Sequence, residues 1–171
     1  MVNRAERILP TDQEIAVALG PRVEMRADRD QSAPKGVGDV LRDAAIDSAY
    51  RRYRGRVLLA DEERPVAVGA LALLFDSSQT ALRTFSQVAE AAHLRTQMGD
   101  ASVAVETVTS RAGLVSYWGF LQTGDVIMIV TLDTVDPKEV SITDLRSLLT
   151  AAAHRLEEHG KTRDGDPGPT P

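Results

Sequence analysis

The three histidines of the chain, His93, His154 and His159, are the first candidates for catalysis or metal binding. His154 and His159 lie near the end of a predicted helix, and at 3.6 residues per turn their side chains point about 140° apart. They therefore cannot easily share a metal ion. His93 comes near the end of another predicted helix, where a cation interacts favourably with the helix dipole. We interpret all three as surface or capping residues.

Carboxylates gather at two places, Asp28 with Asp30 and the run Asp61, Glu62 and Glu63. Paired carboxylates can bind a hard cation or perform acid–base catalysis. Neither group has the spacing of an EF-hand loop, so we interpret both as solvated turns. Serines occur in no G-x-S-x-G or S-x-x-K motif, and the sequence has neither a P-loop nor G-x-G-x-x-G. The absence of cysteine excludes disulfides, thiol catalysis and zinc sites that need thiolates.

The charge balance gives no support for a nucleic-acid interface, because the 171 residues carry a net charge of −5. The densest basic run, RRYRGR at residues 51–56, could contact phosphate, but we interpret it as the solvated end of a helix. The longest apolar run, residues 66–75, is far shorter than the ~20 residues needed to cross a bilayer. We therefore expect a soluble chain with no membrane span.

Strand patterns dominate the middle of the chain. Residues 113–132 predict two apolar strands joined by a tight turn at Gly124-Asp125. The run 66–75 is apolar on both faces, which is typical of a central strand. Further strands are predicted at residues 22–26, 56–60 and 101–109, the last from its alternation of valine and threonine with other residues.

Four helices are predicted from capping residues and apolar stripes. Thr11 and Glu14 have the spacing of a capping box at the start of the first helix, which Gly20-Pro21 ends. The second is predicted over residues 40–53, from a stripe of Leu41, Ala44, Ala45, Ala49 and Tyr53. The third begins at Asp76, and the last runs from Ser141, with Asp144 three residues on, to Gly160.

These elements predict a single α+β domain over residues 1–160. In it an antiparallel sheet of about five to six strands packs against two long helices, with shorter helices at the N-terminus. The last residues, 161–171 (KTRDGDPGPTP), are rich in proline and glycine and predict a disordered tail.

Three aromatic residues, Tyr117, Trp118 and Phe120, lie close together on one predicted strand. Trp118 and Phe120 share one face of that strand and Tyr117 lies on the other, so we favour a core strand buried on both faces. The alternative is that one face lines a cleft for an apolar ligand or a partner chain, since aromatic side chains supply large contact areas. Phe85, on the helix that begins at Asp76, joins these three as a speculative ligand-binding residue.

Three segments resemble a known class of domain: ILPTDQEIAVALG at 8–20, ALALLFDSSQTALRTF at 70–85 and MGDASVAVET at 98–107. Over about residues 8–158 the order of elements is similar to that of actinobacterial extracytoplasmic sensor-like domains. These occur as small lipoproteins and as the outer domains of mycobacterial receptor serine/threonine kinases. The chain departs from the kinase domains in having no cysteine, and it shows no signal or lipid-anchor segment.

This resemblance implies a non-enzymatic binding or sensor-like module for an apolar small ligand or a protein partner, with no catalytic residue, cofactor or metal. It implies an extracytoplasmic location if an export segment has been removed. The alternative is a cytosolic structural or adaptor protein that forms a homodimer through a sheet edge or an apolar helix face. An enzyme whose site is assembled from scattered Asp, Ser and His residues is the hypothesis we favour least.

Overall fold

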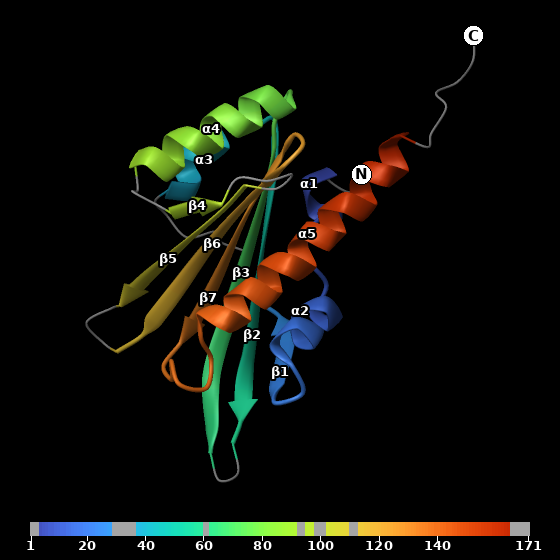
Figure 1. Ribbon diagram of the computed structural model, residues 1–171. Coiled ribbons are helices and arrows are strands. Elements are labelled where there is room, and N and C mark those ends of the chain that lie inside the picture. Colours follow the sequence, from blue (N-terminus) through green and yellow to red (C-terminus); the bar gives the residue numbers. More distant parts are fainter. Residues whose placement is uncertain are drawn as a thin grey trace.

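Seven strands form one antiparallel sheet in the computed structural model, which describes residues 4–28, 37–59, 62–91, 95–97, 102–109 and 113–164 (Figure 1). The strand order is β1-β2-β3-β7-β6-β5-β4, so neighbours in the sheet are also neighbours in the chain except where β3 meets β7. The strands are β1 (Val23–Ala27), β2 (Asp47–Leu58), β3 (Glu63–Leu74), β4 (Arg95–Gln97), β5 (Ser102–Thr109), β6 (Val115–Thr123) and β7 (Val126–Thr134).

Helices lie on both faces of the sheet (Figure 1). Helix α5 crosses one face over β6 and β7, together with α1 and α2, while α3 and α4 cover one end of the opposite face. We call these the α5 face and the α4 face. The helices are α1 (Arg4–Arg7), α2 (Asp12–Leu19), α3 (Val37–Ala44), α4 (Ser78–Ala91) and α5 (Ile142–Asp164).

The larger core lies on the α5 face. Alternate residues of the two central strands point into it, and α5 covers them with Leu145, Leu148, Leu149 and Leu156. The strand residues that this core buries include Val66, Val68, Ala70, Ala72 and Leu74 of β3 and Val126, Met128, Val130 and Leu132 of β7.

The core on the α4 face is smaller and covers only part of the sheet. Phe85 and Ala81 of α4 pack there on Leu71, Leu73, Ile127, Ile129 and Phe120. Because β3 and β7 bury side chains on both faces at this end, their sequences are continuously apolar there. Further along the same strands the α4 face carries small and polar residues instead, namely Ala67 and Gly69 on β3 and Thr131 and Asp133 on β7.

Residues of β2 hold the N-terminal segment on the α5 face. The buried Tyr53 hydroxyl donates a hydrogen bond to the Pro10 carbonyl, and Arg51 Nη1 donates to the same oxygen at 3.4 Å. Helix α2 then begins with the predicted capping box, in which Glu14 N–H donates to Thr11 Oγ1 and Thr11 N–H donates to the Glu14 carboxylate. Burial raises the pKa of Tyr53 to about 12, so this phenol remains a donor at neutral pH.

The predicted α+β class and the antiparallel sheet are confirmed, as is the hairpin between β6 and β7, whose turn has Gly124 at a φ of 55°. The sheet has a strand more than the upper estimate, because β4 is only three residues long and shows no readable periodicity. The cap of helix α4 also differs from the prediction. This helix is capped by Ser77, whose Oγ accepts a hydrogen bond from Thr80 N–H, rather than by Asp76.

The prediction of one helix over residues 40–53 is wrong beyond Ala44, because residues from Asp47 onward form β2. The basic run at 51–56 therefore lies in a strand and is not a helix end. Helix α5 continues through Gly160 to Asp164, so the end predicted at Gly160 is also wrong. The predictions for His93, Asp30, Asp61 and residues 165–171 fall outside the described residues.

Candidate functional site

The four aromatic residues singled out in the sequence lie in three different surroundings. Tyr117 is buried in the core of the α5 face. Phe85 and Phe120 are buried in the core of the α4 face. Trp118 is only partly buried at the edge of that core, with its ring 6.4 Å from the ring of Phe120 and inclined by 26°. The structure therefore brings Trp118, Phe120 and Phe85 to one face and leaves Trp118 partly exposed.

Trp118 lies in a cross-strand row of residues that runs over the α4 face beyond the end of its core, and the neighbour of Trp118 on β5 is Glu106. Strand pairing places Trp118 beside Thr131, Thr131 beside Gly69, and Gly69 beside Arg52. Gly69 and Thr131 are buried, whereas Trp118 and Arg52 are partly exposed. We call this row, with Tyr50 and with the next row of Ser116 and Asp133, the open sheet face.

Tyr50 lies over Gly69, at the centre of the open sheet face. A side-chain Cβ at position 69 would lie 2.6 Å from Thr131 Oγ1 and 2.9 Å from the Tyr50 hydroxyl oxygen. Glycine therefore makes room for two hydroxyl groups that converge above the sheet. Burial raises the pKa of Tyr50, Arg52 lowers it, and Asp133 raises it. The net direction is upward, so the Tyr50 hydroxyl is a hydrogen-bond donor at neutral pH.

The polar groups of this face do not form an activated nucleophile. The Ser116 hydroxyl donates to Asp133 Oδ1 at 2.6 Å, but a carboxylate alone is a weak base for a serine hydroxyl. His154, the histidine whose side chain the structure describes, is exposed on α5 and pairs with Glu158 at 3.7 Å. The arrangement suits hydrogen bonding to a bound molecule better than it suits group transfer.

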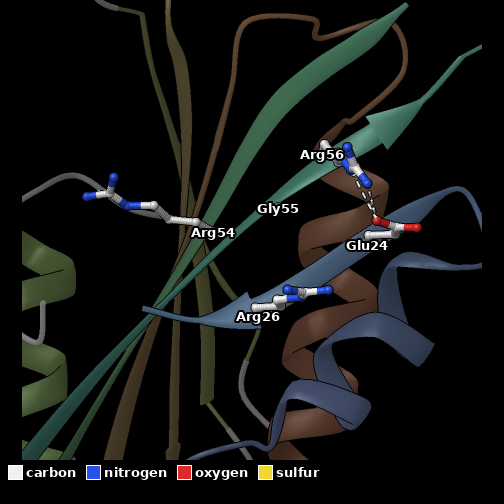
Figure 2. A pocket seen from close by; sticks show the side chains of 5 residues that line it. All are labelled: Glu24, Arg26, Arg54, Gly55 and Arg56. Carbon is white, nitrogen blue, oxygen red and sulfur yellow. Dashed lines mark hydrogen bonds and ion pairs between the residues drawn. The ribbon is translucent and has the colours of Figure 1, made fainter. Parts of the chain in front are cut away.

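A hollow of about 440 Å³ adjoins the open sheet face at the edge formed by β1 and β2 (Figure 2). Pairing of these strands sets Glu24 beside Arg56 and Arg26 beside Arg54. These four side chains and Gly55 line the hollow, which we call the arginine hollow. Arg54 also pairs with Ala67, which pairs with Asp133, so the hollow and the open sheet face share one cross-strand row.

The three arginines of the hollow differ in how they are held. Arg56 contacts Glu24 at 2.9 Å and Glu63 at 2.6 Å, and its pKa is raised mainly by the hydrogen bonds to these carboxylates. Arg54 Nε contacts Asp28 Oδ2, and in Figure 2 its guanidinium points away from the other two arginines. Arg26 is exposed and forms no ion pair with any residue that the structure describes.

The arginine hollow is not predicted from the sequence, because the predicted helix ends at Tyr53 and the basic run at 51–56 is interpreted as the solvated end of that helix. The signal that could have found it is the recurrence of arginine at every second position, 52, 54 and 56, which sets the three side chains on one face of a strand. In the predicted acidic turn, the described carboxylates form ion pairs with arginines, Glu62 with Arg64 and Glu63 with Arg56.

Among the residues that the structure describes, no group of three or more His, Cys, Asp or Glu side chains is placed to hold a metal ion.

Within the described residues, no helix combines the length and the apolar character needed to cross a membrane. Neither a protein-family model nor a curated protein matches the sequence. Among solved structures, the chain is similar to the extracellular domain of PknH from Mycobacterium tuberculosis, with a TM-score of 0.53 and 9% sequence identity. The similarity covers 90% of this chain and 95% of that domain. It supports, at the level of fold alone, the predicted resemblance to outer domains of mycobacterial receptor kinases.

Proposed function

We propose that the chain is a non-catalytic, sensor-like binding module that holds a ligand on its open sheet face. The observation that carries the proposal is the partly exposed Trp118, in one row with Arg52 and beside the hydroxyls that converge over Gly69. An accessible aromatic ring supplies contact area, and a few fixed polar groups orient what binds. The similarity in fold to a receptor-kinase extracellular domain is compatible with such a role.

Of the ligands that the sequence suggested, we favour a small molecule with an apolar or planar part that stacks on Trp118. Phe120 and Phe85 support the Trp118 ring from the core and do not contact such a ligand directly, because both are buried. Tyr117 belongs to the opposite face. As in the resemblance stated above, we place the module among extracytoplasmic sensor-like domains of actinobacterial type.

The neutral dye Nile red tests this proposal without involving charge. We expect the dye to bind and to change the fluorescence of Trp118, which is the single tryptophan of the chain. Trp118→Ala should weaken dye binding severalfold. Leu82→Ala, which removes an exposed apolar side chain from α4, is the matched control and should leave dye binding unchanged. Equal binding by all three proteins would contradict the proposed site.

The alternative of a homo-oligomeric adaptor is less well supported. The outer edge of β1, one of the two edges of the sheet, is partly occupied, because Val23 N–H donates to the Gly20 carbonyl and Ala27 N–H donates to Asp12 Oδ2. An incoming strand would have to displace both. The large apolar side chains that are exposed within the described residues lie on separate segments: Val17, Ile46, Leu82 and Val135. A mass of twice the monomer in light scattering would favour the adaptor.

A further inference from the structure

The arginine hollow has the chemistry of a site for an oxyanion. Three guanidinium groups and one carboxylate line it, on a chain whose net charge is −5. Guanidinium groups match the geometry of phosphate and carboxylate oxygens and lose little hydration when they bind them. Such a concentration of arginine around one concave surface is therefore informative in an acidic protein.

The hydrogen-bond donors available to an anion are those of Arg26 and Arg54. Arg56 is engaged on both sides, by Glu24 through Nε and Nη2 and by Glu63 through Nη1. Arg54 uses Nε for Asp28, whose side chain is only 18% exposed, while Arg54 itself is 63% exposed. To reach an anion in the hollow, Arg54 must turn its guanidinium and give up this contact, so Arg26 is the primary ligand and Arg54 the secondary one. Arg26 has no ion pair to break among the described residues.

We propose that the arginine hollow binds the phosphate group of a phosphate ester, with Arg26 and Arg54 as its ligands and Glu24 as the residue that limits affinity. This inference rests on the proposed function, because it supplies the charged end of the molecule whose apolar part lies on Trp118. A tetrahedral dianion accepts hydrogen bonds from several directions, as separate arginines on β1 and β2 require. A carboxylate ligand is less well suited to the hollow, because Glu24 already supplies a planar carboxylate to Arg56.

The position of the hollow also limits the shape of the ligand. Arg54, which lines the hollow, and Trp118 lie on β2 and β6, which are separated by β3 and β7. At ~4.8 Å between neighbouring strands, the span from β2 to β6 is about 14 Å. A phosphate ester that reaches both ends must therefore carry an elongated apolar part. A lipid phosphate and a soluble phosphate ester both satisfy this requirement.

Titration of the purified full chain with inorganic phosphate, followed by NMR of the arginine Nε–H groups, tests the inference. We expect saturable shifts at Arg26 and Arg54. Arg26→Gln should weaken phosphate binding by about threefold or more. Glu24→Gln should strengthen it, because a carboxylate leaves the hollow while Glu63 still holds Arg56. Arg83→Gln, which removes the same charge from an exposed site on α4, is the matched control and should bind as the wild type does.

The source of the phosphate is distinguished with two probes. Vesicles of phosphatidylcholine containing phosphatidic acid, compared with phosphatidylcholine alone, test a lipid headgroup, and glycerol phosphate tests a soluble ester. Binding to either probe that Arg26→Gln weakens and Arg83→Gln does not supports the inference. No saturable phosphate binding, or equal losses in the two variants, would overturn it.

The two proposals fail separately. If Nile red binds at Trp118 but phosphate does not bind, the sheet face remains a binding site and the oxyanion subsite is rejected. If phosphate binds and Nile red does not, the subsite stands and the apolar part of the site is rejected. Circular dichroism of Arg26→Gln and Glu24→Gln should match the wild type, since both side chains are exposed on β1.

Discussion

The contact between Gly119 and Leu149 fixes how closely α5 approaches the sheet, and it can be tested by a double-mutant cycle. A Cβ at position 119 would lie 2.7 Å from Leu149 Cδ1 and 2.9 Å from Cδ2. The optimal separation of two carbon atoms is about 3.5–4.0 Å, so the added methyl group overlaps Leu149 by roughly 1 Å. Overpacking of this kind costs about 1–3 kcal/mol of unfolding free energy.

Leu149 is itself buried, with 4% of its surface exposed, so Leu149→Ala should cost about 2–5 kcal/mol. In the double variant the methyl group at position 119 occupies space that Leu149 has vacated. We therefore expect the double variant to be no less stable than Leu149→Ala alone, which corresponds to a favourable coupling of about 1–3 kcal/mol.

Urea unfolding of the wild type, Gly119→Ala, Leu149→Ala and the double variant measures this coupling. At this chain length each 1 kcal/mol corresponds to about 2–4 °C in melting temperature, so thermal unfolding gives an independent check. Leu156→Ala, about 10 Å further along α5, is the control and should be additive with Gly119→Ala. Additivity within about 0.5 kcal/mol for Gly119 and Leu149 would refute the close approach of α5 to β6.

Three further predictions concern Tyr53, Thr11 and Trp118. The folded pKa of Tyr53, about 12, lies above its unfolded value of about 10, so the folded state keeps a proton that the unfolded state loses. Stability is therefore unaffected below about pH 10 and should fall by roughly 2–3 kcal/mol toward pH 12, a loss that urea unfolding should find reduced in Tyr53→Phe. Thr11→Ala should cost about 1 kcal/mol in urea unfolding and Thr11→Ser almost nothing, because the hydroxyl caps α2. Trp118→Ala should cost less than the roughly 3–5 kcal/mol of a fully buried aromatic residue, since this ring is partly exposed; a full loss in calorimetry would move it into the core.

Sequence patterns predicted the fold best where the period of burial was unambiguous. The run at residues 66–75 and the hairpin around Gly124 could be read directly, because apolar runs bounded by turn residues form strands. Ala49 and Tyr53 led to the wrong prediction of a helix over residues 40–53, because a separation of four residues fits both the helical period of 3.6 and the strand period of 2. In the structure both lie on β2 and face the α5 side.

The candidate site was harder to predict because it depends on pairing between distant strands. That Trp118 shares a face with Phe120 follows from alternation along one strand. That Arg52 and Gly69 lie in the same row as Trp118 requires the register between β2, β3, β7 and β6, which no local pattern specifies. The hollow likewise requires β1 to pair with β2.

The pairing of β3 with β7 has a mechanical consequence. Strands β1 to β3 form one meander and β4 to β7 form another, and the ladder from Val66 to Leu74 is the sole strand pairing between them in the described sheet. A molecule that contacts both Arg52 and Trp118 would bridge this junction. Its binding energy would then oppose separation of the two meanders. Binding of this molecule should therefore slow amide hydrogen exchange along β3 and β7.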